Sequence, residues 1–208
     1  WVKKPGANTP AHIQPLLDAI IERTGLPISL DGIYRWVAFL PSRVDARVPV
    51  ANRYFGAFQD GSLKLRGIEA RRGDTPHYIR EMQEAMLAVM RQAGTRAELA
   101  ACEDEVRGIY READAGLSDA PPSSMAIRRQ VSRLSYSRRC PEASAVAACR
   151  AAGIGVEAGM EIGYVVTDTR TWSVELDWVA KRFDQGYYRN LLGKAWEEIA
   201  FAFRQARG

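Results

Sequence analysis

The sequence has few of the residues that build disulfide frameworks, metal centres or membrane anchors. Its three cysteines are far apart and include no Cys-x-x-Cys pair, so neither a disulfide framework nor a zinc site is predicted. Its two histidines, His12 and His77, have no neighbouring ligands and are expected to be surface or helix-start residues. No apolar run approaches the ~18 residues of a membrane span, and the start lacks the apolar centre of a signal peptide. A cytoplasmic protein without a membrane partner is expected.

The sequence also lacks an Asp-x-Asp pair, and its Asp and Glu residues are scattered over predicted helices and turns. Two-metal phosphoryl transfer needs carboxylates that hold both ions close together. We therefore expect no catalytic and no metal-binding residue in this chain. Alone, it should be catalytically inactive.

Positive charge is unevenly distributed along the chain. The formal net charge is +4 over 208 residues, but residues 1–80 have +5, residues 81–120 have −5, residues 121–170 have +3 and the remainder has +1. Two basic zones on either side of an acidic one suit a protein that contacts a polyanion on one side only. Charged faces that are simply solvated are the alternative, and charge patterning alone favours that alternative.

A basic hairpin is predicted within residues 50–76. Two short extended runs, 53–58 and 63–68, are joined by Asp60-Gly61, a dipeptide that readily supplies the positive φ angles of a tight turn. This stretch should present positive charge because it has five basic residues on little backbone: Arg53, Lys64, Arg66, Arg71 and Arg72.

Hydrophobic spacing before the hairpin predicts one helix and two strands. Residues 10–24 have apolar side chains at the helical period, and Gly25 is placed to end the helix. Its apolar stripe is expected to pack on the neighbouring strands. Residues 27–30 and 33–40 are predicted strands, the second being rich in aromatic and β-branched residues.

After Thr75 the spacing changes from strands to helices. A helix is predicted over residues 76–91, and Thr95 opens a further helix with a capping-box pattern. The order of elements predicts an α+β fold: antiparallel strands with a packed helix, followed by a mostly helical domain with a few short strands. We therefore place a domain boundary near Thr75.

Two segments of the hairpin resemble motifs of the family B DNA polymerases. Residues 52–56 (Asn-Arg-Tyr-Phe-Gly) resemble the Lys-Lys-Arg-Tyr-x-Gly segment of that family. Residues 66–74 (Arg-Gly-Ile-Glu-Ala-Arg-Arg-Gly-Asp) resemble the Lys-Gly-apolar-Glu-x-x-Arg-x-Asp segment that follows it there. Two motifs in the right order at the right separation are far more specific than either one alone.

The second half of the chain supports the same resemblance. Residues 127–134 form a basic and extended run, and residues 141–152 form a helix closed by Gly153. Residues 159–166 (Gly-Met-Glu-Ile-Gly-Tyr-Val-Val) are a predicted strand, and residues 184–188 (Asp-Gln-Gly-Tyr-Tyr) head the last helix. Family B thumb domains show a similar succession, so the resemblance covers nearly the whole chain.

The resemblance implies a C-terminal portion of a DNA-directed DNA polymerase. Residues 1–75 would be the C-terminal part of the palm, after the Tyr-x-Asp-Thr-Asp-Ser motif, and residues 76–208 the thumb. The catalytic aspartates would lie outside the chain. No cofactor is expected in this fragment, although Mg²⁺ is expected for the whole enzyme. The expected partners are primer-template duplex and the remaining polymerase parts (N-terminal, exonuclease, fingers and palm), in a prokaryotic nucleoid.

A polymerase grips any sequence, so contacts are expected with phosphates and with the minor groove. Asn52 stands where the family has Lys, which keeps a hydrogen-bond donor but removes the charge. Gly56 is compatible with close approach of DNA or with a β-bulge, and Arg72 with a phosphate contact or with pairing to Asp74. The predicted DNA-binding residues are Asn52, Arg53, Tyr54, Gly56, Lys64, Arg66, Arg71, Arg72, Arg128, Arg129 and Arg133.

Two alternatives stay open at this point. The chain could be a non-catalytic nucleic-acid-binding or assembly subunit derived from a polymerase thumb. It could also be a helical interaction protein with a fortuitous hairpin. Binding to duplex DNA at rising salt discriminates, because only the DNA-gripping hypotheses predict a steep loss of affinity.

Overall fold

A computed structural model describes residues 2–3, 5–42, 44–45 and 48–207. The described residues form two antiparallel sheets, with strand orders β1-β2-β3 and β4-β5-β6, and confirm the predicted α+β fold. The strands are β1 (Tyr34–Pro41), β2 (Pro49–Phe58), β3 (Leu63–Arg66), β4 (Ile127–Gln130), β5 (Glu161–Asp168) and β6 (Ser173–Leu176). The α-helices are α1 (Pro10–Thr24), α2 (His77–Met90), α3 (Arg96–Ala101), α4 (Glu103–Gly116), α5 (Pro141–Ala151) and α6 (Gln185–Arg207). Short 3₁₀ helices are η1 (Glu69–Arg71), η2 (Leu117–Asp119) and η3 (Pro122–Met125).

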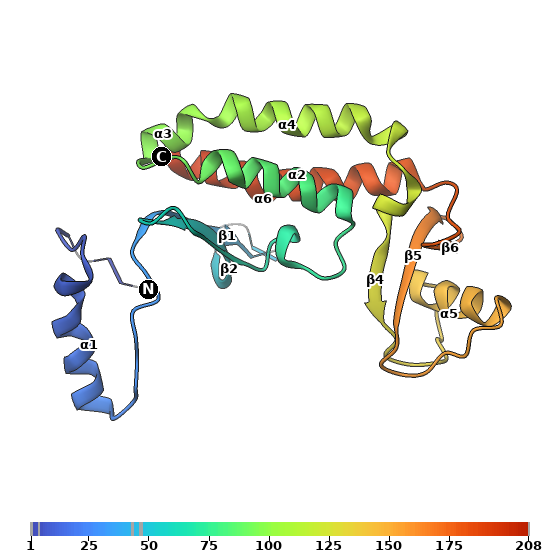
Figure 1. Cartoon of the computed structure of the whole chain (residues 1–208), viewed down its shortest axis with the longest axis horizontal. Helices are drawn as coiled ribbons and strands as arrows, with labels where there is room; N and C mark the ends of the chain where they lie inside the picture. Colours follow the sequence, from blue (N-terminus) through green and yellow to red (C-terminus); the bar gives the residue numbers. More distant parts are fainter. Residues whose placement is uncertain (1, 4, 43, 46–47, 208) are drawn as a thin grey trace.

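The elements are arranged as an arch (Figure 1). Helices α2, α4 and α6 run side by side along its top, and the first sheet lies beneath α2 and α6. The second sheet and α5 project downward at one end of these helices, and α1 projects downward at the other. No described helix is both long and apolar enough to cross a bilayer.

The predicted hairpin is confirmed by β2 and β3. Gly61 has a φ of +82°, and the Asp60 carboxylate accepts hydrogen bonds from the backbone N–H and hydroxyl of Ser62 at 2.8 and 2.7 Å. An Asp side chain that bonds two residues ahead stabilises such a turn. The second strand is shorter than predicted because Gly67, with a φ of +63°, turns the chain toward η1.

Gly56 is explained by the approach of β1. The register between β1 and β2 shifts between Tyr34 and Trp36, which marks an irregularity of the bulge type. A Cβ on Gly56 would lie 2.6 Å from the carbonyl oxygen of Trp36 and 2.9 Å from the ring of Tyr34. Glycine is therefore required here by the packing of two strands.

Two expectations for the N-terminal region are wrong. Residues 27–30 form no strand, and the chain there is irregular. Helix α1 has the predicted bounds and ends at Gly25 with a φ of +66°, but none of its residues is buried. Its apolar stripe is half-buried at Leu17 and 38% exposed at Ile21, so it does not pack on the first sheet.

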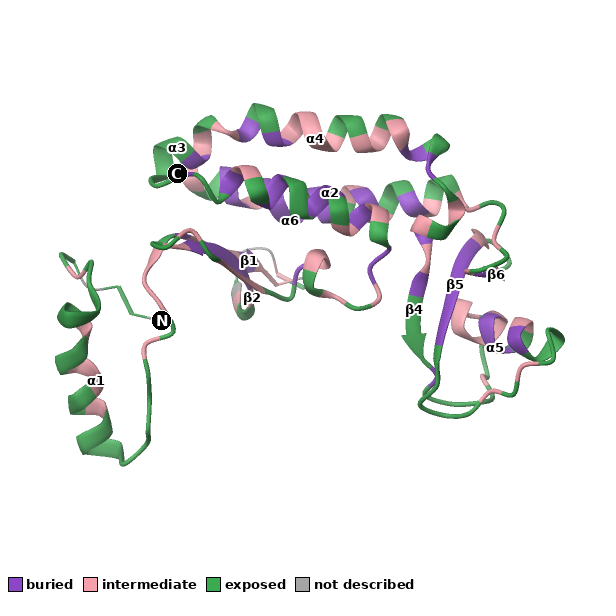
Figure 2. Cartoon of the chain, in the orientation of Figure 1, coloured by how far each residue is buried: buried purple, intermediate pink, exposed green. Residues whose placement is uncertain are grey.

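The described residues bury two hydrophobic cores, visible as separate purple regions in Figure 2. The first core joins the first sheet to α2, α3, α4 and α6, and the second joins the second sheet to α5 and the start of α6. Helix α6 serves both, since Tyr188 lies in the second core and Leu192 in the first. The division into palm and thumb at Thr75 stays a prediction.

Helix α6 begins at a well-satisfied cap. Asp184 accepts hydrogen bonds from the backbone N–H groups of Tyr187 and Thr169 at 3.0 and 2.9 Å, and from the Thr169 hydroxyl at 2.9 Å. Tyr188 is fully buried, and its hydroxyl accepts from the backbone N–H of Val166 at 2.9 Å. Tyr188 therefore packs in the second core.

Candidate nucleic-acid interface

The pairing of β2 with β3 sorts the hairpin side chains onto two faces. Tyr54 pairs with Arg66 and Gly56 pairs with Lys64. Directly paired residues share a face of a sheet, as do residues two apart along one strand. Five predicted contact residues thus share one face: Asn52, Tyr54, Gly56, Lys64 and Arg66. The opposite face has Phe55 in the first core, against the helices.

The members of this shared face differ in how they are engaged. Asn52 and Arg66 are exposed, and neither side chain has a partner among the described residues. The Lys64 Nζ lies 2.9 Å from Asp31 Oδ1, in an ion pair whose carboxylate is 60% exposed. Tyr54 is only 7% exposed and packs on Phe39, with ring centroids 5.6 Å apart. Asn52 and Arg66 are therefore the groups of this face that are open to a ligand.

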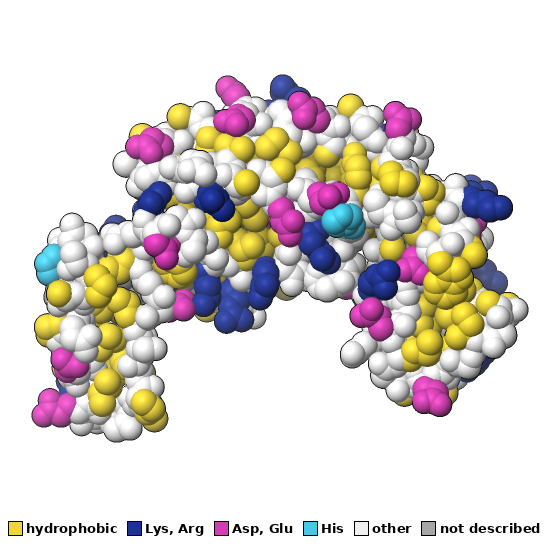
Figure 3. Space-filling view, in the orientation of Figure 1, with side chains coloured by type: hydrophobic (Ala, Val, Ile, Leu, Met, Phe, Trp, Pro, Cys, Tyr) yellow, Lys and Arg dark blue, Asp and Glu magenta, His cyan; other side chains and the backbone are white. Residues whose placement is uncertain are grey.

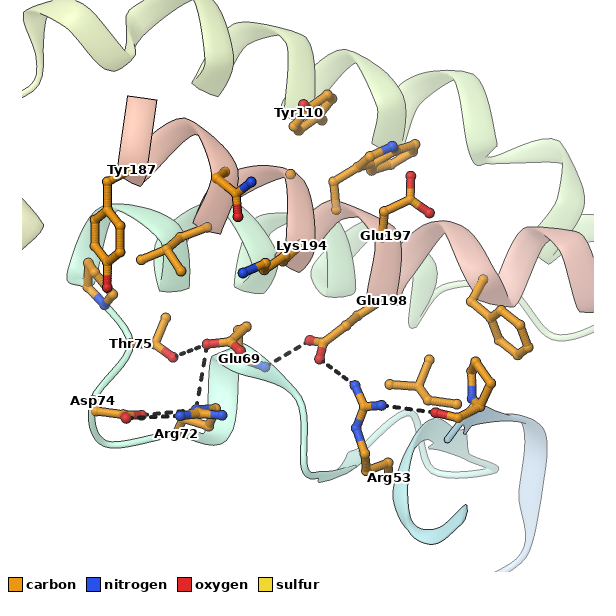
Figure 4. A pocket seen from close by; sticks show the side chains of 18 of the residues that line it. Arg53, Glu69, Arg72, Asp74, Thr75, Tyr110, Tyr187, Lys194, Glu197 and Glu198 are labelled. Carbon is orange, nitrogen blue, oxygen red and sulfur yellow. Dashed lines mark hydrogen bonds and ion pairs between the residues drawn. The ribbon is translucent and has the colours of Figure 1, made fainter. Parts of the chain in front are cut away.

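Arg53 points the other way and is tied to α6 (Figure 4). Its guanidinium donates to Glu198 Oε1 at 2.9 Å and to the Pro41 carbonyl oxygen at 3.0 Å. Glu198 Oε2 also accepts from the backbone N–H of Glu69 at 3.0 Å. Burial raises the pKa of the Glu198 carboxyl, against the opposing effect of these hydrogen bonds. Arg53 is thus a link between β2 and α6.

A buried glutamine completes this network. Gln83, on α2, is fully buried, and its Nε2 donates to Glu198 Oε2 at 3.2 Å and to the Ala195 carbonyl oxygen at 3.0 Å. Its Oε1 accepts from the backbone N–H of Ala70 at 2.5 Å. Each polar group of the Gln83 amide is satisfied, so the network fixes η1, α2 and α6 together.

A second ion network joins the segment just after η1 to β4. Arg72 donates to both carboxylate oxygens of Asp74 at 2.9 Å, and Arg129 donates to Asp74 at 2.8 Å and to Glu142 at 2.7 Å. The Arg72 hydrogen bonds, followed by the charges of Arg72 and Arg129, hold the pKa of Asp74 below its usual range despite partial burial. The internal pairing considered for Arg72 is therefore present.

The remaining predicted residues, Arg71, Arg128 and Arg133, are exposed. Arg128 lies 2.9 Å from Asp177 and 3.9 Å from Glu161. The Arg133 guanidinium lies 5.7 Å from the ring centroid of Tyr136. Arg71 is exposed, and its side chain has no partner in the described part of the chain. No run of acids lies near Arg128 and Arg129 in the sequence, and their acidic partners come from other segments of the folded chain.

The two networks line one open cavity of about 840 Å³ beneath α6 (Figure 4). Sequence reasoning missed the polar residues that α6 contributes to it, among them Lys194 and Glu198. The available signal was the polar side of an amphipathic helix, which does not indicate what that side meets. Figure 3 shows the underside of the arch, where Lys and Arg side chains gather around the hairpin.

Among the described residues, no three His, Cys, Asp or Glu side chains come together as ion ligands. The carboxylates beneath α6 are instead bonded to arginines, and a carboxylate paired in this way does not fit a magnesium centre. We therefore assign these carboxylates a structural role, in which they hold the arginines and the elements that carry them.

The chain is similar to known proteins in sequence and in fold. No family model matches the chain. The chain is 31% identical over 162 residues to DNA polymerase 2 of Aeropyrum pernix, which is 77% of this chain and 19% of that protein. A family B DNA polymerase from Pyrobaculum calidifontis superposes with a TM-score of 0.61 and 20% identity, over 96% of this chain and 25% of the other. The chain thus spans about a fifth of the length of the curated relative.

Proposed function

Because the chain resembles the family B DNA polymerases in sequence and in fold, we propose that it is the C-terminal palm and thumb portion of such an enzyme. In this role it grips primer-template duplex during template-directed synthesis, through phosphates and the minor groove. The catalytic carboxylates and the Mg²⁺ ions that they hold belong to other parts of the polymerase, which are its protein partners. Residues 1–75 form the end of the palm and residues 76–208 the thumb.

The shared face of the hairpin carries the proposal. It faces away from the helices and combines the hydrogen-bonding side chain of Asn52 with the guanidinium of Arg66, which no described residue pairs with. Arg71 follows on η1 and is also unpaired within the described residues. An amide side chain and free guanidinium groups can contact groove acceptors and phosphates without reading sequence.

The paired arginines have a different part in this proposal. Arg53, Arg72 and Arg129 are bonded to carboxylates of the same chain, so binding a phosphate would require exchange of those bonds. Breaking such pairs costs free energy that an unpaired arginine does not lose. We therefore assign the first phosphate contacts to Arg66, Arg71 and Arg133. Arg53, Arg72 and Arg129 hold the elements that carry them.

The test is binding of a labelled primer-template duplex to the chain at increasing KCl concentrations. Affinity should fall steeply, and Arg66→Gln should reduce the slope of log K against log salt by about one unit. Arg111→Gln is the matched control, because Arg111 is also exposed and unpaired in the described chain but lies on α4, on the other side of the helices (Figure 1). Salt-independent binding, or equal slopes for both variants, would contradict the proposal.

A further inference from the structure

The described lining of the cavity beneath α6 has one positive charge that no described acidic side chain balances. This lining includes four carboxylates, and each is paired with an arginine of the same lining. The pairs are Glu69 with Arg72 at 3.7 Å, Asp74 with Arg72 at 2.9 Å and Arg129 at 2.8 Å, Glu197 with Arg204 at 3.3 Å, and Glu198 with Arg53 at 2.9 Å. Lys194 is the remaining cation of that lining, and no described acid pairs with it.

Two further polar groups lie beside Lys194 on α6. Tyr187, Asn190 and Lys194 are spaced by three and four residues, so they share one side of the helix, and all three line the cavity. In the described structure, the amide of Asn190 and the hydroxyl of Tyr187 have no hydrogen-bond partner. Burial raises the pKa of Tyr187, which keeps its hydroxyl protonated and able to donate. Figure 4 shows Tyr187 and Lys194 among the side chains that line this cavity, together with Glu69 and Arg72.

We infer that this side of α6 binds a phosphate group inside the cavity. Lys194 supplies the charge, and Asn190 and Tyr187 supply neutral hydrogen bonds. A phosphate fits this set because its several acceptor oxygens can take donors of different kinds at once, and a lysine ammonium suits it as a compact point charge. The surrounding carboxylates do not block it, because each is already bonded to an arginine.

Two sources could supply this phosphate, and the experiment separates them. If it belongs to the duplex backbone, the inference rests on the proposed function and adds α6 to the surface that grips DNA. If it is free, as in inorganic phosphate or pyrophosphate, the site binds independently of DNA.

The key variant is Lys194→Gln, which removes the charge while keeping a polar side chain of similar length. Lys181→Gln is its control, because Lys181 is also exposed but does not line the cavity. In the duplex assay, Lys194→Gln should lower the salt slope by about one unit and weaken binding, whereas Lys181→Gln should change neither. In the second arm, inorganic pyrophosphate is titrated into each protein, and the amide resonances of α6 are followed by NMR.

The outcomes are distinct. A lower duplex slope for Lys194→Gln supports the duplex source. An unchanged slope, with pyrophosphate shifts of α6 that disappear in Lys194→Gln, supports the free source. If Lys194→Gln changes neither the duplex slope nor the pyrophosphate shifts, the inference is overturned, even if wild-type protein binds duplex. If wild-type protein shows no salt-dependent duplex binding, the proposed function fails, and the pyrophosphate arm still decides on the site.

Discussion

Removal of the Glu198 carboxylate should destabilise the chain strongly. Glu198→Ala would leave the Arg53 guanidinium, the Glu69 N–H and the Gln83 amide without their common acceptor. Breaking a buried ion pair by deleting one partner costs about 3–5 kcal/mol. The Arg53 side chain is still 19% exposed and keeps the Pro41 carbonyl, so we expect the lower limit, about 3 kcal/mol.

Glu198→Gln should be milder. It keeps one acceptor oxygen for Arg53 but turns an amide N–H₂ toward the donors of Glu69 and Gln83, for a cost of about 1–2 kcal/mol. The control is Glu197→Ala, because Glu197 is 64% exposed and pairs only at the surface with Arg204, which should be worth less than about 1 kcal/mol. Urea unfolding followed by tryptophan fluorescence gives the free energy of unfolding of each variant.

The pH dependence follows from the raised pKa of Glu198. The folded state binds this proton more tightly than the unfolded state, so the resulting stability is present below the unfolded value of 4.5 and is lost as pH rises through the folded pKa. The free energy of unfolding of the wild type should therefore exceed that of Glu198→Gln by the largest amount at low pH. A loss below about 0.5 kcal/mol for Glu198→Ala, or a wild-type advantage that grows with pH, would refute this reasoning.

Three further substitutions test the fold, each by urea unfolding. Asp184→Ala removes the α6 cap and should cost about 2 kcal/mol at pH 7. Burial would raise the pKa of Asp184, but the hydrogen bonds that it accepts from Tyr187 and Thr169 outweigh burial and lower this pKa. The cost should therefore shrink as pH falls through that pKa, and a pH-independent cost would contradict the cap. Gly56→Ala places a Cβ 2.6 Å from the Trp36 carbonyl oxygen and should cost about 1–3 kcal/mol, whereas Gly155→Ala, with nothing within 4 Å, should be close to neutral; equal effects would be inconsistent with the strand contact. Thr95→Ala removes the acceptor for the Glu98 N–H at 3.2 Å and should cost about 1 kcal/mol, and an unchanged midpoint would show that the cap contributes nothing.

Features that depend on neighbouring residues could be predicted from the sequence. The turn at Asp60-Gly61 and the end of α1 at Gly25 are examples, because a positive φ and a local side-chain bond decide both. The Thr95 cap is another, since its partner Glu98 lies three residues ahead. Local chemistry was sufficient in these cases.

Contacts between distant segments could not be predicted in this way. Arg53 and Glu198 are 145 residues apart, and Arg129 and Asp74 are 55 apart. Their pairing depends on how α6 and β4 pack, which no local pattern encodes. The arginines that the sequence presents as free cations therefore divide into paired and unpaired groups only once the chain is folded. The expected strand at residues 27–30 failed for a related reason, because β propensity alone forms no strand without a neighbour to pair with.

Helix α6 passes through both hydrophobic cores as one continuous rod of 23 residues, about 35 Å long. Spreading the two cores apart would bend this rod and break backbone hydrogen bonds inside it. The chain also crosses between the cores where α4, which packs on the first core, meets η2, whose Leu117 lies in the second. Helix α6 should therefore hold the two cores at a fixed separation.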